Sequence, residues 1–540
     1  MILAHALLNA LKDYGAGEIF GIPGDFALPF FKEIEASNVL PLFTLSHEPG
    51  VGFAADAAGR YRSTIGVACI TYGAGALNMI NPIATAYSEK SPMVVISGAP
   101  GIGERNMGLG LHHQVKHLDS QMMIMKEVTC AQCVLDDAQT APVEIARVLR
   151  TAREMSRPVY IEFPRDMVGV EVDEVPGPVT REANVDAAQA AADEVIRLLD
   201  GAENPALLLG VEIRRFGLEA KVSRLANILG IPAVTSFMGS GILAEADGPV
   251  AGTYLGLAGE EDIRQIVERS DGLLMLGVIL CDTNFGVSKR ELDMRHTVHA
   301  FDGEVRMAHH VYPEVTLEAL VDALLSKAQK LGEAKAVVRD YDTELDEWDS
   351  QILPADVATV VNRFFNKNGE MPIASDMGDC LFTAMDMQQT ALVAPAYYAT
   401  MGTGIPFGIG LEVASGKRPL VLVGDGAFQM TGWELGNAKR LGLKPIILLF
   451  NNTAWGMLKA FQEGTRYNDL DDWKFADLAN TLGGNGMRVT TPRELEEALD
   501  TAHADENRYH LIEIMLPREA MSKTLRRFTE TISKRSALGE

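Results

Sequence analysis

Cysteine is scarce in this chain, with five residues among 540. So few cysteines cannot stabilise a chain of this length through disulfide bonds. This excludes a disulfide-stabilised secreted fold and fits a reducing compartment. The segment Cys130-Ala-Gln-Cys133 has the spacing of metal and redox sites, but no second pair or nearby histidine accompanies it. Because residues 128–135 have the character of a strand, we expect two buried small side chains there and no metal.

Positive charge is also lacking, since 48 Lys and Arg face 73 Asp and Glu for a net charge of −25. This charge opposes attraction to nucleic acid or to anionic lipid, so neither is expected as a partner. No apolar run approaches the length of a membrane span. The first 13 residues have no basic segment and no small-residue cleavage site, and their apolar positions recur at helical spacing. We therefore expect an amphipathic first helix and a cytoplasmic protein.

Apolar runs rich in β-formers alternate with helical patterns along the whole chain, which predicts an α/β fold with open, doubly wound parallel sheets. A chain of this length is too long for one hydrophobic core, and three domains of ordinary size are expected. Composition shifts at Val175-Pro-Gly-Pro-Val179 and between Ala334 and Ser350 predict domains over residues 1–178, 179–345 and 346–540.

An internal near-repeat relates the first and third predicted domains. One copy runs from Val67 into Gly73-Ala-Gly75, and the other runs from Val421 into Gly424-Asp-Gly426. In both, a helical pattern follows the glycines and a Pro precedes the next apolar strand. Two copies of one βαβ unit are the simplest interpretation. Only the second copy has an acid between its glycines.

That acid, Asp425, is the centre of a predicted metal site. Glycines beside it let backbone N–H groups approach an anion closely, although Gly-Asp-Gly alone is more often a tight turn. Asn451-Asn452 follows the next strand, with 24 residues between Gly426 and Asn451. Successive parallel strands end at the same edge of a sheet, so the two groups should lie close together. Asp425, the amide oxygen of Asn452 and a backbone carbonyl near Ala454 therefore predict a Mg²⁺ site beside a diphosphate.

Gly-Asp-Gly followed at this distance by Asn-Asn resembles the signature of thiamin-diphosphate enzymes. Other segments come in the order found in the pyruvate and indolepyruvate decarboxylase branch: Gly21-Ile-Pro-Gly-Asp-Phe26, His47-Glu48, Leu111-His-His113, Ser156-Arg-Pro-Val-Tyr160 and Gly424-Asp-Gly-Ala-Phe-Gln-Met-Thr-Gly-Trp-Glu434. The likeness covers essentially the full length, and within the branch the chain is most similar to phenylpyruvate decarboxylases. It implies thiamin diphosphate and Mg²⁺ as cofactors, a pyrimidine-binding first domain, a middle domain and a diphosphate-binding third domain. It also implies non-oxidative decarboxylation of a 2-oxo acid through an ylid and an enamine.

The resemblance assigns catalytic roles to Glu48, Asp25, His112 and His113. Glu48 matches the carboxyl group that faces N1′ of the aminopyrimidine and favours its imino tautomer. A carboxyl group with this role should be largely desolvated. Asp25 and the two histidines match groups that deliver a proton and assist aldehyde release, and histidines titrate near working pH.

The resemblance also implies further cofactor contacts. Met401 matches the bulky side chain that holds the two cofactor rings in a V, and Ala399 would offer its carbonyl to the pyrimidine amine. The remaining expected cofactor-binding residues are Asp379, Gly424, Gly426, Ala427, Trp455 and Met457.

Two positions depart from the pyruvate decarboxylase pattern. Leu458 stands where that pattern has a glutamate, which removes an ionisable group and, with Trp455 and Met457, predicts a larger and drier substrate pocket. Such a pocket suits phenylpyruvate first and indole-3-pyruvate second. Asp379 stands where a Thr-Ser pair is usual near the diphosphate. Either its backbone N–H makes that contact or its side chain points away.

The family divides each active site between two subunits, which implies at least a homodimer and favours a homotetramer, a dimer of dimers. A carboligase with the same cofactor is an alternative function. A nucleotide-binding protein using Gly73-Ala-Gly75 or Gly101-Ile-Gly103 is another, but neither run completes the dinucleotide fingerprint. A catalytically silent relative would be expected to lack Glu48 or Asp425, and both are present.

Overall fold

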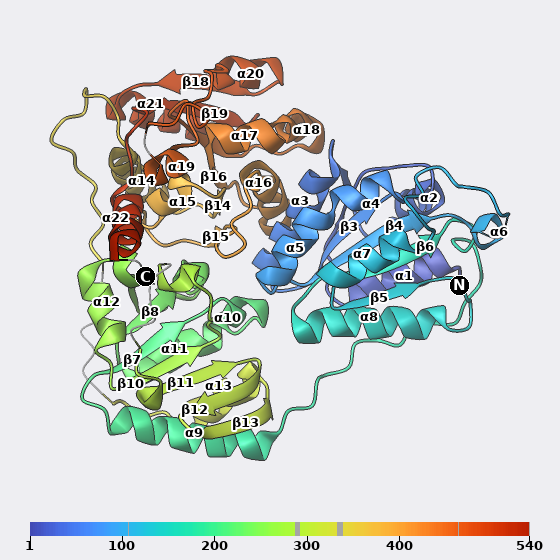
Figure 1. The fold of residues 1–540 in the computed structure, drawn as a ribbon, viewed down its shortest axis with the longest axis horizontal. Helices are drawn as coiled ribbons and strands as arrows, with labels where there is room; N and C mark the ends of the chain where they lie inside the picture. The colour runs from blue at the N-terminus through green and yellow to red at the C-terminus, as the bar shows by residue number, and fades with distance from the viewer. Residues whose placement is uncertain (106, 287–291, 332–338, 463, 539–540) are drawn as a thin grey trace. The chain divides into compact units, whose positions relative to one another are not determined.

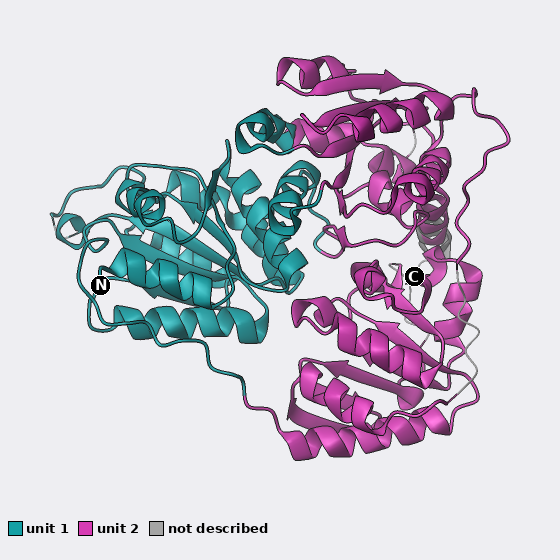
Figure 2. Cartoon of the chain, turned by 180° about the vertical axis from the view of Figure 1, so that it is seen from behind, with its two compact units in different colours: residues 1–181, 398–417, 431–443 teal, residues 182–397, 418–430, 444–540 magenta. Residues whose placement is uncertain are grey.

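The computed structural model describes residues 1–105, 107–286, 292–331, 339–462 and 464–538 (Figure 1). Its contacts group into two compact units (Figure 2). Unit 1 comprises residues 1–181, 398–417 and 431–443, and unit 2 comprises residues 182–397, 418–430 and 444–540. The three domain ranges expected above remain predictions, and the stretch from Ala334 to Ser350 begins outside the described residues. No helix among those described has the length and apolarity that crossing a membrane requires.

Unit 1 is built on a six-stranded parallel sheet in the order β2-β1-β3-β4-β6-β5. The strands are β1 (Ile19–Gly21), β2 (Leu42–Thr44), β3 (Gly66–Ile70), β4 (Met93–Ala99), β5 (Ala131–Val134) and β6 (Val159–Pro164). The helices are α1 (Leu3–Asp13), α2 (Leu28–Ser37), α3 (Glu48–Arg62), α4 (Ala74–Asn78), α5 (Ile80–Ser88), α6 (Ile102–Arg105), α7 (Ser120–Val128) and α8 (Ala141–Met155). α16 (Gly404–Ser415) and α18 (Leu435–Leu441) complete the unit.

The sheet of unit 1 is covered on both faces. Val67 and Cys69 of β3 belong to the core that α1, α2 and α8 form on one side. Ala68 and Ile70 point to the other side because side chains alternate along a strand, and both are fully buried. Burial on both faces is what a parallel sheet requires and explains the unbroken apolar run. The amphipathic helix expected at the start of the chain is confirmed as α1.

Cys133 lies in β5 and Cys130 directly precedes it, so the predicted strand is confirmed. Cys133 is buried, whereas Cys130 is only partly buried, so the expectation of two buried side chains was right for Cys133 alone. Both thiols are free, and burial raises the pKa of Cys133 to about 12 and that of Cys130 to about 11.

Unit 2 contains a second six-stranded parallel sheet, in the order β15-β14-β16-β17-β19-β18. Its strands are β14 (Ile373–Ser375), β15 (Leu392–Val393), β16 (Leu420–Gly424), β17 (Ile446–Asn451), β18 (Asn485–Val489) and β19 (His510–Met515). Around it lie α14 (Pro354–Asn368), α15 (Asp379–Ala384), α17 (Asp425–Thr431), α19 (Gly456–Phe461), α20 (Phe475–Thr481), α21 (Pro492–Ala504) and α22 (Lys523–Leu538). Strand for strand, this order repeats that of unit 1, so the internal repeat is confirmed.

The other sheet of unit 2 is parallel in its main part but not at one edge. Its order is β13-β12-β11-β10-β7-β8-β9, and β12 and β13 pair antiparallel. The strands are β7 (Pro205–Leu209), β8 (Ala233–Ser236), β9 (Val250–Tyr254), β10 (Gly272–Leu276), β11 (Thr297–Phe301), β12 (Gly303–Met307) and β13 (His310–Val315), with α9 (Val185–Asp200), α10 (Glu212–Arg215), α11 (Glu219–Leu229), α12 (Glu261–Glu268) and α13 (Leu317–Lys327). The links from β11 to β13 are far shorter than a parallel crossover needs, so these strands can only form hairpins.

Candidate active site

The predicted site residues of unit 1 follow the carboxyl ends of its strands. Asp25 follows β1, Glu48 follows β2, and His112 and His113 lie in the loop after β4. The strand order reverses between β1 and β3, and open α/β sheets bind ligands at such switch points. The same reversal lies between β14 and β16 in unit 2.

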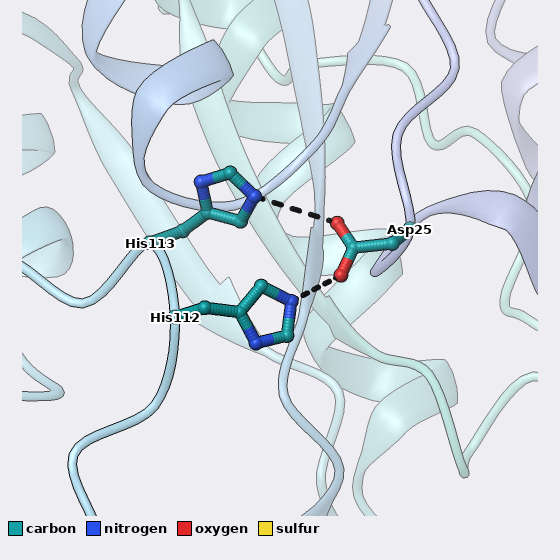
Figure 3. A group of neighbouring side chains, drawn as sticks. All are labelled: Asp25, His112 and His113. Carbon is teal, nitrogen blue, oxygen red and sulfur yellow. Dashed lines mark hydrogen bonds and ion pairs between the residues drawn. The ribbon is translucent and has the colours of Figure 1, made fainter.

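Asp25, His112 and His113 form one cluster (Figure 3). His112 Nε2 shares a hydrogen bond with one carboxylate oxygen of Asp25, and His113 Nε2 lies 3.6 Å from the other. Burial raises the pKa of Asp25, but the hydrogen bond and charge of His112 outweigh burial and hold it below its usual value. The side chains stay partly open to solvent, which suits groups that exchange protons with a substrate. Among the described residues this is the one group of three His, Cys, Asp or Glu side chains close enough to share a metal ion.

The residues that support His112 could not be predicted from sequence motifs. Its imidazole stacks on the ring of Phe26 at 4.6 Å between centroids. The guanidinium of Arg165 lies 5.1 Å from the centre of the same ring and pairs with Glu104. Arg165 lies far along the chain from both His112 and Phe26, so no short motif could reveal the stack.

Glu48 is the first residue of α3, and Asn78 Nδ2 donates to its carboxylate at 3.0 Å. The turn before it is held by Glu434, which accepts the backbone N–H groups of Ser46 and His47 at 2.9 and 3.0 Å. Glu48 is only partly buried in the single chain, which is less desolvation than its expected role requires. Neither Asn78 nor Glu434 was predicted to act here, although Glu434 ends one of the motifs quoted above.

Ala399 and Met401 lie in the segment of unit 1 that precedes α16. Ala399 has φ +59°, a left-handed conformation that costs an L-residue about 1–2 kcal/mol. Backbone strain of this kind persists only where neighbouring contacts hold it, and it is common at ligand sites. Met401 is partly buried, so its side chain is neither sealed in the core nor free in solvent.

In unit 2 the predicted metal ligands converge. The backbone N–H of Ala454 donates to Asp425 Oδ2 at 3.2 Å and to Asn452 Oδ1 at 3.1 Å. Asp425 also accepts the N–H of Gly426 at 2.8 Å and is 3% exposed. Burial raises the pKa of Asp425 to about 7 even though backbone hydrogen bonds oppose the shift. A divalent cation would favour the charged form, because opposite charge stabilises a buried carboxylate.

The surroundings of Asp425 and Asn452 fit a metal ion bound together with a phosphate group. The indole N–H of Trp455 is buried and finds no acceptor among the described residues. A Cβ at Gly426 would overlap the Trp455 indole, and one at Gly456 would overlap the amide of Asn452. Buried donors rarely stay unpaired, so an orphan N–H beside two converging oxygens suits a bound phosphate and its metal.

Asp379 and Leu458 are the two positions that depart from the family pattern. The carboxylate of Asp379 accepts the backbone N–H of Ser522 at 3.0 Å, and burial raises the pKa of Asp379 to about 6. This contact favours the alternative in which the side chain of Asp379 points away from the diphosphate. Leu458 is 48% exposed, more than a dry pocket requires, whereas Met457 packs against the core of unit 2.

Comparison with known proteins agrees with this geometry. The chain matches the thiamine pyrophosphate enzyme N-terminal TPP binding domain over residues 1–124, the central domain over 192–327 and the C-terminal TPP binding domain over 376–514. It is 56% identical over 537 residues to an indole-3-pyruvate decarboxylase from Azospirillum brasilense, covering 98% of both chains. It is 29% identical to an alpha-keto-acid decarboxylase from Mycobacterium ulcerans over 538 residues, 95% of this chain and 93% of that one. The chain therefore belongs to the thiamine pyrophosphate-dependent 2-oxo acid decarboxylase family.

Proposed function

We propose that this enzyme decarboxylates aromatic 2-oxo acids without oxidation, with phenylpyruvate and indole-3-pyruvate as substrates and the aldehyde and CO₂ as products. The convergence of Asp425 and Asn452 on the N–H of Ala454 carries the proposal. These two oxygens hold Mg²⁺, with the carbonyl of Ala454 as a third ligand. The relative from Azospirillum brasilense is named for indole-3-pyruvate, which supports an aryl substrate.

The chain's own groups bind each end of the cofactor. Gly424 and Ala427 offer backbone N–H groups to the diphosphate, as helix N-termini do, and the Trp455 indole N–H is a further donor. Gly426, whose N–H binds the Asp425 carboxylate, leaves this turn without a side chain and so lets the diphosphate approach. Glu48 faces the pyrimidine from the start of α3. Thiamine pyrophosphate, when bound, supplies the nucleophilic carbon and the electron sink that loss of CO₂ requires.

Proton handling falls to two groups of residues. Glu48 exchanges a proton with the pyrimidine ring, and the hydrogen bond from Asn78 orients its carboxylate. His112 and His113 deliver a proton to the substrate carbon and accept one from the substrate oxygen as the aldehyde is released, and Asp25 holds both imidazoles toward one point. The stack of His112 on Phe26 fixes the plane of the imidazole.

The substrate side chain lies against Trp455, Met457 and Leu458. No carboxylate stands at Leu458, so an aryl group meets an apolar wall. The partial exposure of Leu458 and Glu48 supports an active site completed by a second copy of the chain, in a dimer or a dimer of dimers. We also infer a cytoplasmic location from the scarcity of cysteine in the sequence.

A reconstitution experiment tests the function. The protein is stripped with a chelator, and thiamine pyrophosphate and Mg²⁺ are then restored separately and together. Aldehyde formation from phenylpyruvate, indole-3-pyruvate and pyruvate is coupled to alcohol dehydrogenase. The buffer contains Mg²⁺ as its only divalent metal, because Asp25, His112 and His113 could also bind a transition metal.

Turnover that requires both additions and favours the two aryl substrates supports the proposal. Turnover without Mg²⁺, or an Asp425→Ala variant that keeps full Mg²⁺-dependent activity, contradicts the metal site. The carboligase alternative is tested by product analysis with added aldehyde. An acyloin as the main product would replace decarboxylation as the function, whereas free aldehyde as the main product supports it.

A further inference from the structure

The backbone just before Ala399 is fixed by a buried carboxylate. Glu89, directly after α5, accepts the N–H of Tyr398 on Oε1 at 3.0 Å. Its Oε2 accepts from Arg60 Nη1 at 2.6 Å. Both oxygens of Glu89 are therefore engaged, one by the protein backbone and one by a cation.

Arg60 is in turn held by Asp56, whose two carboxylate oxygens accept from Nε at 2.9 Å and from Nη2 at 2.8 Å. Arg60, Asp56 and Glu89 are 3%, 0% and 1% exposed. Burial lowers the pKa of Arg60, but the two carboxylates more than offset this and keep it above its usual value. Buried charges are stable only when paired and hydrogen-bonded, so the Glu89 carboxylate has little freedom to move.

The side chain of Thr400, directly after Ala399, is held by the hydroxyl of Thr85 on α5. Thr85 donates its single proton to the carbonyl of Asn81 at 2.9 Å. The 3.0 Å contact between the hydroxyls of Thr85 and Thr400 must then be donated by Thr400. Thr85 is fully buried, so no water competes for this contact.

Glu89 and Thr85, called the two anchors below, belong to a closely packed part of unit 1. Asp56 and Arg60 lie on α3, which lies beside α16 (Figure 1). The helices approach so closely that a Cβ at Gly410 would overlap the carbonyl of Ala54. The segment around Ala399 leads directly into α16, so the frame that holds it is rigid.

We propose that Glu89 and Thr85 are positioning residues that hold Ala399 in its left-handed conformation and thereby aim its carbonyl at the pyrimidine end of thiamine pyrophosphate. The inference rests on the proposed function, in which Ala399 would offer its carbonyl to the pyrimidine amine as the family resemblance implies. Neither residue touches the cofactor. Each acts through the residue that it holds beside Ala399.

Two variants weaken the anchors without emptying space. Thr85→Val removes the acceptor of Thr400 at similar volume. Glu89→Gln replaces one carboxylate oxygen with an NH₂ donor. This donor must face either Arg60 or the N–H of Tyr398, which are themselves donors, so one of the two hydrogen bonds is lost. Arg60 remains paired with Asp56. Each should weaken thiamine pyrophosphate binding about five- to tenfold at saturating Mg²⁺, measured by titration calorimetry. Binding of inorganic pyrophosphate with Mg²⁺ should not change, because pyrophosphate has no pyrimidine.

Two matched controls accompany these variants. Thr85→Ser keeps the hydroxyl and should bind the cofactor like the wild type. Thr129→Val makes the same change at another buried threonine, which donates to the Met125 carbonyl, and should leave both affinities unchanged. Ala399→Gly combined with Thr85→Val should recover part of the lost affinity, because glycine adopts positive φ without strain.

Thiamine pyrophosphate affinities within twofold of wild type in both anchor variants would overturn the inference. So would an equal loss of pyrophosphate binding, which would indicate a general disturbance, or no recovery in the double variant. These results are separate from failure of the proposed function. That failure would appear as wild-type turnover that does not require Mg²⁺, or as an Asp425→Ala variant that keeps full activity.

Discussion

Gly456→Ala should damage the metal site while sparing the fold. Gly456 is the first residue of α19, and a Cβ there would overlap Nδ2 of Asn452. The amide has to move by about 1 Å to reach ordinary van der Waals separation. Metal–ligand distances tolerate only about 0.2 Å, and Mg²⁺ demands near-octahedral geometry. We therefore expect Mg²⁺ affinity to fall roughly 10- to 100-fold, or about 1.4–2.8 kcal/mol.

The same substitution should not weaken the helix. Gly456 has no positive φ, and alanine is favoured over glycine in helices by up to about 1 kcal/mol. Mg²⁺ is titrated into chelator-treated protein with excess thiamine pyrophosphate, and quenching of tryptophan fluorescence reports binding. Thermal unfolding without ligands reports stability.

The control is Gly103→Ala, a helical glycine in α6 whose added Cβ meets nothing within 4 Å. It should leave both measurements unchanged. A Gly456→Ala protein that binds Mg²⁺ as tightly as the control would refute the reasoning, because Asn452 could not then be a ligand in the observed position.

Three further predictions concern unit 1. Glu48→Gln should keep thiamine pyrophosphate affinity within about threefold but lose at least about 100-fold in kcat, because an amide cannot exchange the proton; calorimetry and steady-state kinetics measure the two. Asp25→Asn should lower kcat by about 100-fold. Because the hydrogen bond and charge of His112 outweigh burial and hold the pKa of Asp25 below its usual value, the wild-type pH–rate profile should show no loss of activity from protonation of Asp25 at the pH where a free aspartate titrates. Burial raises the pKa of Glu162 from 4.5 to about 7, with Arg105 opposing the shift. Its stabilising effect is complete below pH 4.5 and is lost as the pH rises through 7, by up to about 3 kcal/mol. Glu162→Gln should remove that loss in urea unfolding at pH 4.5 and 8, and an unchanged pH dependence would contradict the assignment.

The sequence predicted the repeated sheets well because their signal is local. Apolar strands, glycine turns and helical patterns recur in the same order in both copies, and chain order fixes which strands are adjacent in a βαβ unit. The hairpins β11-β12-β13 were not predicted although Asp302-Gly303 is a turn signal, because the alternation of strands and helices along the rest of the chain favours crossovers. Discontinuous packing was also invisible: residues 398–417 and 431–443 group with the first 181 residues.

Within the candidate site, sequence motifs found the groups at strand ends but not the groups that hold them. Asp425 and Asn452 follow consecutive strands, so their proximity could be inferred from topology alone. Asn78 and Glu434 act on Glu48 and its turn through contacts set by tertiary packing. The burial of Glu48 was overestimated, since a single chain leaves it partly open and sequence patterns do not show how much a second copy would cover.

The divergence of the two repeats has an electrostatic reason. In the first copy, a Cβ at Gly75 would lie 3.1 Å from Oε1 of Glu48, so this turn lies beside a carboxylate and a further acid in it would be repelled. In the second copy, Asp425 is surrounded by backbone N–H donors and the amide of Asn452, with no carboxylate among its hydrogen-bond partners in the described residues. The neutral turn therefore suits the proton exchange proposed for Glu48, and the acidic turn suits the cation proposed at Asp425. One βαβ unit thus supplies two different sites, because its glycine turn lies close to an acid that follows β2 in one copy and to an amide that follows the adjacent strand β17 in the other.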